Sequence, residues 1–343
     1  MSVLKMGIIG VGGIAQARHL PAFKQMTNVE VTAVQDVNGT RAQEVATKFD
    51  VPYAFDNIQD LFEKVDAVTI CTPNKFHADI SVAALEAGVH VLCEKPMAMT
   101  TAECEAMVAA AEKNDRLLSI AYHYRHTAEG RLAKGAMQEV GDPLVTRVQA
   151  MRQRKVPGWG VFTNKELQGG GSLIDFGCHL LDLALWLLDD PKPVEVMGKT
   201  YDRLSKVPNQ VNDWGTFDHE TFNVDDHVTS YITFEDGSSM QFECSWAANI
   251  KEDHTTLTIS GADGGLSVYP FEVYQPKFGS MMETTSQVEG GEEAAGLVQA
   301  ENFVNSCLGT DELVVKPEQA LKVSQLIEAI YESSETGTSV RLK

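Results

Sequence analysis

The strongest constraint on the fold is a regular alternation of short apolar runs with helix-like segments near the start of the chain. Five apolar runs have the length and composition of buried strands: residues 6–11, 29–36, 67–73, 90–96 and 117–122. The segments between them include the helical patterns 41–50, 77–88 and 100–115, and Thr100 followed by Glu103 predicts a capping box. This alternation predicts a parallel, doubly wound sheet with right-handed crossovers.

The sequence changes character after residue 122. Helix-like segments at 127–139 and 172–188 flank one strand-like run, 144–153. Alternating segments without helices between them then follow at 226–236, 238–247 and 254–269. The letters "EDGSS" indicate a hairpin, helices are expected near 293–309 and 317–335, and 201–223 is expected to be a long substrate-side loop.

These patterns predict two domains of different kinds. Residues 1–122 are expected to form an α/β domain of the Rossmann type, which binds a dinucleotide. Residues 123–343 are expected to form an α+β domain with a large, mainly antiparallel sheet. A chain of 343 residues is also longer than one hydrophobic core usually serves.

Charge and composition exclude several partners. The net charge of −20 argues against nucleic acid, which requires clustered Lys and Arg side chains. Six cysteines without a C-x-x-C pair are typical of a reducing compartment. The chain shows no cleavage-site pattern and no run of 18 apolar residues, so we expect a cytoplasmic protein with no membrane partner.

A glycine-rich turn follows the first predicted strand. Gly10, Gly12 and Ala15 form a G-x-G-x-x-A pattern that also contains Gly13 and Ile14, and Asp36 ends the second strand. Such a turn lets the backbone approach a pyrophosphate at a helix N-terminus. A carboxylate at the second strand end accepts hydrogen bonds from ribose hydroxyls and repels a 2′-phosphate, so NAD is favoured over NADP. The alternative is a glycine turn in an α/β domain that binds nothing.

Two later strand ends add candidates, because ligands bind beyond the carboxyl ends of parallel strands. "CTPN" supplies Thr72, Pro73 and Asn74 with His77 behind them, although a plain turn with a helix cap would look the same. "EKP" supplies Glu94 and Lys95, whose ammonium could stabilise a developing alkoxide, whereas a lysine considered alone would be a solvated surface residue. The predicted cofactor site comprises Gly10, Gly12, Gly13, Ile14, Ala15, Asp36, Thr72, Pro73, Asn74, His77, Glu94 and Lys95.

The predicted helix in "GGGSLIDFGCHLLDLALWLLDD" (169–190) carries a charged seam on an otherwise apolar surface. Asp175, His179 and Asp182 are spaced to lie on one helical face. Burying charge without partners is unfavourable, so the seam needs an explanation. One is a general base, His179, oriented by Asp175. The others are a buried structural histidine with a capping aspartate, and a metal site, for which one His and two carboxylates are a thin ligand set.

Taken in order, "GVGGIA", the Asp36 strand end, "CTPN" with His77, "EKP", "GGGSLIDFGCH" and the segment 222–247 resemble the glucose-fructose oxidoreductase / inositol dehydrogenase (Gfo/Idh/MocA) family. The resemblance spans nearly the whole chain. It implies a Rossmann domain followed by a domain whose open sheet often forms contacts between subunits, and hence a homodimer or homotetramer. It also implies that Lys95, Asp175 and His179 are catalytic, that Asp182 lies near the substrate, and that the Lys95–Pro96 peptide is often cis.

The function expected from these observations is NAD-dependent oxidation of a secondary hydroxyl of a sugar, glycoside or cyclitol. His179 would remove the hydroxyl proton, Lys95 would stabilise the alkoxide, Asp175 would hold His179, and no metal is expected. The expected substrate-binding residues are Lys95, Tyr122, Arg125, Arg152, Trp159, Asp175, His179 and Asp182. Three alternatives are a glycosidase that retains its NAD, a non-catalytic dinucleotide sensor, and a metal-dependent dehydrogenase.

Overall fold

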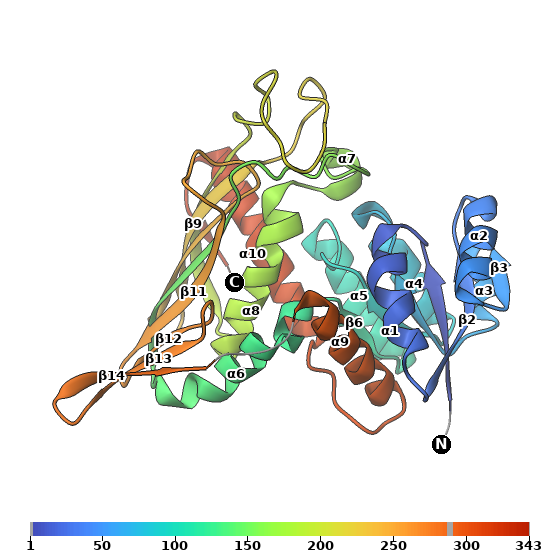
Figure 1. Ribbon diagram of the computed structural model, residues 1–343, viewed down its shortest axis with the longest axis horizontal. Coiled ribbons are helices and arrows are strands. Elements are labelled where there is room, and N and C mark those ends of the chain that lie inside the picture. Colours follow the sequence, from blue (N-terminus) through green and yellow to red (C-terminus); the bar gives the residue numbers. More distant parts are fainter. Residues whose placement is uncertain (1–2, 287–290, 343) are drawn as a thin grey trace. The chain divides into compact units, whose positions relative to one another are not determined.

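The computed structural model describes residues 3–286 and 291–342 (Figure 1). The chain divides into two compact units, each built from separate stretches of sequence. Unit 1 comprises Met1–His126 and Gly290–Leu321, and unit 2 comprises Thr127–Glu289 and Lys322–Lys343.

Unit 1 is built around a parallel sheet, which we call sheet A. Its strand order is β3-β2-β1-β4-β5-β6, and every neighbouring pair is parallel. The strands are β1 (Leu4–Ile9), β2 (Val29–Gln35), β3 (Tyr53–Phe55), β4 (Ala67–Ile70), β5 (His90–Cys93) and β6 (Leu118–Ile120). All five predicted strands are present, and the short β3 was not predicted. The order reverses at β1, which is where doubly wound sheets bind ligands.

Helices connect these strands, as the alternation predicts. They are η1 (Ala15–His19), α1 (Leu20–Lys24), α2 (Gly39–Phe49), α3 (Ile58–Phe62), η2 (Asn74–Phe76), α4 (His77–Glu86) and α5 (Thr101–Asn114). Unit 1 also contains η3 (His123–His126), which follows β6, and α9 (Glu292–Cys307), which follows β14 in the chain. The predicted capping box is present at α5, where Thr100 Oγ1 accepts from Glu103 N and Glu103 Oε2 accepts from Thr100 N. The first turn after the glycines, η1, is a π-helix.

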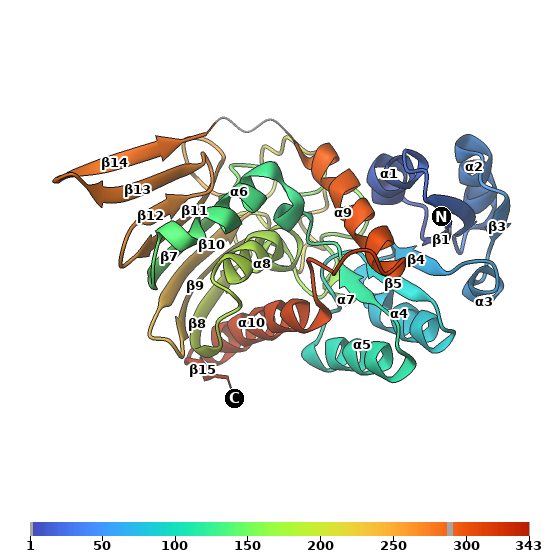
Figure 2. The same cartoon turned by 90° about the horizontal axis from the view of Figure 1, so that it is seen from below.

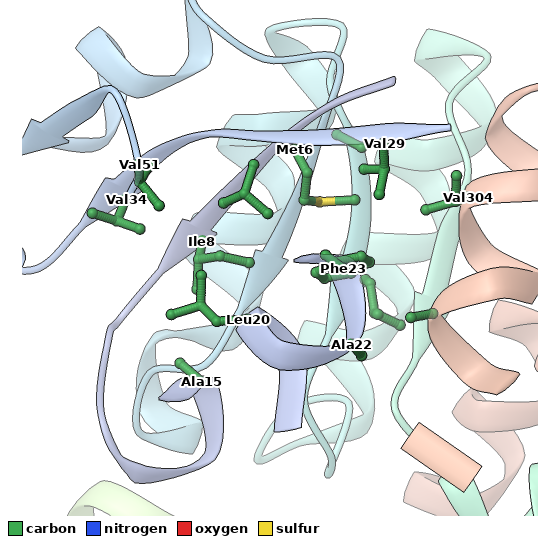
Figure 3. Packing of buried hydrophobic residues seen from close by; sticks show 14 of the residues in the cluster. Met6, Ile8, Ala15, Leu20, Ala22, Phe23, Val29, Val34, Val51 and Val304 are labelled. Carbon is green, nitrogen blue, oxygen red and sulfur yellow. The ribbon is translucent and has the colours of Figure 1, made fainter. Parts of the chain in front are cut away.

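The core of unit 1 includes a helix from far along the sequence. Figure 3 shows Met6 and Ile8 of β1 near Phe23, with Val304 of α9 on the same cluster. Phe23 and Val304 are fully buried, and Asn28 Nδ2 donates to Asn305 Oδ1 at 3.1 Å. The packed units are therefore discontinuous, whereas the sequence analysis used one boundary at residue 122. The division into functional domains 1–122 and 123–343 stays a prediction.

Unit 2 is built around a mixed sheet, sheet B, with strand order β14-β13-β12-β11-β7-β10-β9-β8-β15. Only β7 and β10 pair in parallel among its described strands. The strands are β7 (Pro143–Met151), β8 (Pro193–Tyr201), β9 (His227–Phe234), β10 (Ser239–Ser245), β11 (His254–Gly261), β12 (Gly265–Ser267), β13 (Glu272–Lys277), β14 (Ser280–Thr285) and β15 (Val340–Arg341). The "EDGSS" hairpin joins β9 to β10, and the predicted fold class is confirmed.

Helices cover one face of sheet B (Figures 1 and 2). They are α6 (Ala128–Ala136), η4 (Met137–Glu139), η5 (Leu173–Gly177), α8 (Cys178–Leu187) and most of α10 (Pro317–Thr336). The short helix α7 (Lys165–Gln168) lies in the connection between β7 and η5. A Cβ on Gly177 would lie 2.8 Å from Cys244 Sγ of β10, so this glycine lets the helix approach the sheet closely. The segment 172–188 is helical as predicted, but its first turn, η5, is a π-helix.

No helix within residues 3–286 and 291–342 combines the length and the apolar composition that crossing a bilayer requires.

Candidate active site and cofactor site

The glycine-rich turn sits directly after β1 and has the geometry that pyrophosphate binding requires. Gly10 has φ of +79°, and a Cβ there would lie 2.9 Å from the Cys71 carbonyl oxygen, so only glycine fits. A Cβ on Gly12 or Gly13 would meet no heavy atom within 4 Å, so the backbone at these positions borders open space. Ala15 is fully buried at the start of η1, and Ile14 is half-buried before it. These residues fit a dinucleotide phosphate.

Asp36 connects the glycine turn to the end of β2. Its Oδ2 accepts from Val11 N at 3.2 Å, and its Oδ1 accepts from Asn38 N at 2.9 Å. The Arg41 guanidinium lies 3.3 Å from Oδ1. The carboxylate therefore orders the turn itself, in addition to any contact with a ribose.

His77 joins the ends of β4 and β5. Its Nδ1 lies 2.8 Å from the Pro96 carbonyl oxygen, and its Nε2 lies 2.9 Å from the Thr72 carbonyl oxygen. Burial lowers the pKa of His77, and the side chain has no exposed surface. His77 is therefore placed to hold the two strand ends rather than to contact a ligand directly. Thr72 and Pro73 are half-buried, whereas Asn74 is buried in η2.

A buried carboxylate fixes the backbone at Lys95. Glu94 Oε1 lies 2.7 Å from His19 Nε2, and Glu94 Oε2 accepts from Lys95 N at 3.1 Å. Burial alone would raise the pKa of Glu94, but the hydrogen bond and charge of His19, together with Arg18 and Lys95, lower it to about 2. Glu94 is therefore a carboxylate at neutral pH. The Lys95–Pro96 peptide is cis, as the family resemblance implies.

His123 adds a neutral ring to the same network. Arg18 Nη1 lies 3.3 Å from His123 Nδ1, and a guanidinium can only donate, so Nδ1 is the acceptor. Burial and the nearby Arg18 charge lower the pKa of His123 to about 3.

In unit 2 the charged seam lies at the start of the helix that sequence analysis singled out. Asp175, in η5, is half-buried, and its Oδ2 accepts from Trp246 Nε1 at 3.1 Å. His179, in α8, is 7% exposed. The fully buried Trp246 therefore fixes the Asp175 carboxylate from sheet B. That Asp175 orients His179 stays a prediction.

Asp225 caps the N-terminus of this helix with four hydrogen bonds. Its Oδ1 accepts from Gly171 N at 2.8 Å and from Tyr331 Oη at 2.7 Å. Its Oδ2 accepts from Ser172 Oγ at 2.8 Å and from Leu173 N at 2.9 Å. A Cβ on Gly171 would lie 2.0 Å from the Asp225 carbonyl oxygen, so this close contact requires glycine at position 171.

The Arg152 guanidinium contacts two aromatic rings. Its guanidinium carbon lies 3.7 Å from the Phe176 ring centroid and 4.3 Å from the Trp214 ring centroid. Trp214 in turn lies 5.6 Å from Trp159, which is 55% exposed. The loop 201–223, which has no clear sequence pattern, therefore contributes an aromatic side chain beside the catalytic candidates.

Three predicted substrate ligands have no accessible side chain. Arg125 is 1% exposed, and its Nη1 donates to the Val314 carbonyl and to Gln319 Oε1, so it links segments within unit 1. Tyr122 and Asp182 are also fully buried, which counts against direct contact with a substrate. Polar residues after a strand or on a helix face look alike in sequence whether they bind a ligand or support the fold, and the substrate contacts of these three residues stay a prediction.

Sequence reasoning missed Asp225, Trp246 and Trp214. "VDDH" at 224–227 carries a pair of acidic residues before a strand, a signal that could have suggested a cap. The pairing of Trp246 with Asp175 joins residues 71 positions apart and has no local signal. In the described residues, no group of three or more His, Cys, Asp or Glu side chains is arranged to hold a metal ion.

Comparison with known proteins places this arrangement in a family. The model described as "Oxidoreductase family, NAD-binding Rossmann fold" matches residues 4–122, and the "GFO/IDH/MocA C-terminal domain" matches residues 133–267. The chain is 34% identical to D-glucoside 3-dehydrogenase of Escherichia coli strain K12, covering 99% of this chain and 98% of that protein. It is 26% identical to D-xylose 1-dehydrogenase (NADP(+)) 2 of Haloferax volcanii, covering 99% and 100%.

A solved structure supports the same fold. The complex of levoglucosan dehydrogenase with NADH and levoglucosan superposes with a TM-score of 0.86 at 22% identity, covering 99% of both chains. The chain therefore belongs to the Gfo/Idh/MocA family of oxidoreductases, and its Rossmann domain binds NAD.

Proposed function

We propose that this protein oxidises a secondary hydroxyl of a sugar, glycoside or cyclitol, with NAD as the hydride acceptor. The observation that carries the proposal is the Asp175 carboxylate, held by the buried Trp246 on the helix that also carries His179. An apolar helix against a sheet gains nothing from that carboxylate, whereas an acid–base site does. The names of the relatives, which include a glucoside 3-dehydrogenase and a xylose dehydrogenase, support the substrate class.

In the proposed reaction, His179 takes the proton of the substrate hydroxyl and Asp175 stabilises the resulting imidazolium. The Lys95 ammonium donates a hydrogen bond to the same oxygen and stabilises the developing alkoxide. Bound NAD supplies the acceptor for the carbinol hydride. In the reverse direction His179 returns the proton to the carbonyl oxygen. We likewise propose that residues 1–122 carry the cofactor site and that residues 123–343 carry substrate recognition.

The preference for NAD over NADP is part of the proposal. Asp36 already accepts from two backbone N–H groups, and its negative charge would face the 2′-position of the ribose. The Haloferax relative is named for NADP, so family membership alone does not decide the cofactor. Comparing kcat/KM for the two cofactors at equal concentration tests this point directly.

We also propose a homodimer or homotetramer assembled through sheet B. Tyr231 of β9 is 46% exposed, whereas Ser230 and Ile232 beside it are buried, so Tyr231 lies on the more exposed face of sheet B. Light scattering should give a mass above that of one chain. Tyr231→Arg should lower the mass, whereas Leu132→Arg on α6 should not.

The test of the activity is a screen for NADH formation with inositols, aldoses and glycosides. A turnover that needs Lys95 and His179 supports the proposal. Cofactor that stays bound through purification, together with substrate cleavage but no net NADH, would instead indicate a glycosidase. Binding of NAD with no turnover of any polyol would indicate a sensor, and loss of activity on exhaustive chelation would indicate a metal-dependent enzyme.

A further inference from the structure

We propose that unit 2 contains a separate subsite for a second, apolar-faced ring of the substrate, formed by Trp159 and Trp214. The inference rests on the proposed function and narrows it. The substrate class becomes glycosides whose aglycone is a ring, such as an aryl group or a second sugar, in preference to free monosaccharides and cyclitols.

Trp159 and Trp214 form an exposed aromatic surface, which we call the platform. Trp159 is 55% exposed and lies between Gly158 and Gly160, so no neighbouring side chain in the sequence shields its ring. Its ring is tilted by 45° to that of Trp214 at 5.6 Å, and Phe162 meets it edge-on at 6.2 Å. Such rings give a flat ligand a large apolar contact, and their amphipathic indoles are common in ligand sites.

The position of the platform separates a ring bound there from the sugar ring that is oxidised. Phe176 directly follows Asp175, and the Arg152 guanidinium stacks on Phe176 at 3.7 Å. Trp214 also contacts that guanidinium, at 4.3 Å from its ring centroid, and Trp159 contacts Trp214. The contacts that link Trp159 to the helix of His179 therefore run through Trp214 and Arg152. We therefore assign the ring that stacks on Trp159 to the aglycone, and not to the sugar whose hydroxyl faces the catalytic residues.

Hydrogen bonds hold the two segments of the platform together. Asn212 Oδ1 accepts from Val156 N at 2.8 Å, and its Nδ2 donates to the carbonyls of Val156 and Gly215 at 2.8 and 2.7 Å. Gly158 N donates to the Trp214 carbonyl at 3.1 Å, and a Cβ on Gly158 would lie 2.7 Å from that oxygen. The loop is thus ordered before a ligand arrives, which reduces the entropy lost on binding.

This arrangement also changes the role expected of Arg152. A planar guanidinium between two rings acts as a bridge that fixes Trp214, so Arg152 is a positioning residue and not a direct ligand of sugar hydroxyls. Lysine keeps the charge but cannot stack in the same way. Arg152→Lys should therefore weaken binding of the second ring, raising KM for ring-bearing glycosides more than it lowers kcat.

The experiment compares two glycosides of one sugar, with phenyl and methyl aglycones. The wild-type enzyme should prefer the phenyl glycoside in kcat/KM, and Trp159→Ala should reduce the phenyl-to-methyl ratio about 3- to 10-fold, the range of a lost aromatic contact. Trp159→Phe should restore most of the ratio. Phe278→Ala, which removes an aromatic side chain that is 96% exposed at the tip of the β13–β14 hairpin, should leave the ratio and the activity unchanged.

A second measurement separates failure of the subsite from failure of the proposed function. Phenyl glycoside should change the tryptophan fluorescence of the full-length protein in a titration, and Trp159→Ala should raise the half-saturating concentration about 3- to 10-fold. If no sugar is oxidised but this dependence on Trp159 is found, the redox proposal fails and the subsite stands. An unchanged ratio in both Trp159→Ala and Trp214→Ala, or an unchanged half-saturating concentration in Trp159→Ala, overturns the subsite.

Discussion

Replacing Asp225 with asparagine tests how the catalytic helix is held. Each carboxylate oxygen accepts two hydrogen bonds, one of them from a backbone N–H of Gly171 or Leu173. The partners of the other two bonds, Tyr331 Oη and Ser172 Oγ, are hydroxyls that can turn and accept instead. A backbone N–H cannot turn. Whichever way the asparagine amide is oriented, its NH₂ group faces one backbone donor.

The expected loss of folding stability follows from the number of hydrogen bonds that the substitution breaks. One buried N–H without an acceptor costs about 1–3 kcal/mol, and the remaining bonds lose the strength that the charge gave them. We expect the free energy of unfolding to fall by about 2–4 kcal/mol in total, and Tm to fall by roughly 5–10 °C. Because η5 begins at this cap and continues into α8, and the two carry Asp175 and His179, kcat should fall as well.

Differential scanning calorimetry measures the effect, with Glu220→Gln as an exposed substitution that removes one charge without a cap. Tyr331→Phe should cost about 0.5–1.5 kcal/mol in the wild type and close to nothing in an Asp225→Ala background, because its acceptor is already gone. A Tm for Asp225→Asn within 1–2 °C of the wild type, or additive losses in the double mutant, would refute this account of the cap.

Three further outcomes follow from the site. Lys95→Ala and His179→Ala should each lower kcat by about 10²- to 10⁴-fold, while NADH affinity, measured by fluorescence titration, changes far less; near-normal turnover in either variant removes that residue from the mechanism. Asp36→Ala should reduce the preference for NAD over NADP about tenfold, as expected when one charge-assisted hydrogen bond is lost; a wild-type enzyme that prefers NADP contradicts the role given to Asp36. The depressed pKa of Glu94 means that its contribution to stability is complete above its ordinary pKa of 4.5 and is lost as pH falls toward about 2. Urea unfolding of the wild type and Glu94→Gln should therefore differ most above pH 5 and converge in acid, and a difference that grows on acidification would show the opposite sign.

The sequence predicted most of the fold because local patterns determine it. Strand–helix alternation located sheet A apart from β3, whose run of three residues, Tyr53–Phe55, is too short to predict a strand. The edge strand β14 was also not predicted, because every one of its residues is exposed and no buried face alternates along it. The π-helical turn η5 was not predicted either, because its spacing of apolar residues resembles that of an α-helix.

The candidate site was predictable where chemistry depends on neighbours in sequence, as at Gly10 and the Glu94–Lys95–Pro96 strand end. It was not predictable where partners come from distant segments. Nothing in the sequence indicated that the Arg152 guanidinium contacts the rings of Phe176 and Trp214, which are 24 and 62 positions away. The same holds for Arg125, whose partners lie about 190 positions away in sequence.

The return of α9 to the core of unit 1 has a practical consequence for any attempt to express the Rossmann half alone. A fragment that stops at residue 126 would lack Val304 against Phe23, the Asn305 partner of Asn28, and the Val315 carbonyl that accepts from Ser119 Oγ at 3.0 Å. Its uncovered apolar surface would favour aggregation. A minimal nucleotide-binding protein should instead splice residues 291–321 onto residue 126 through a short flexible linker.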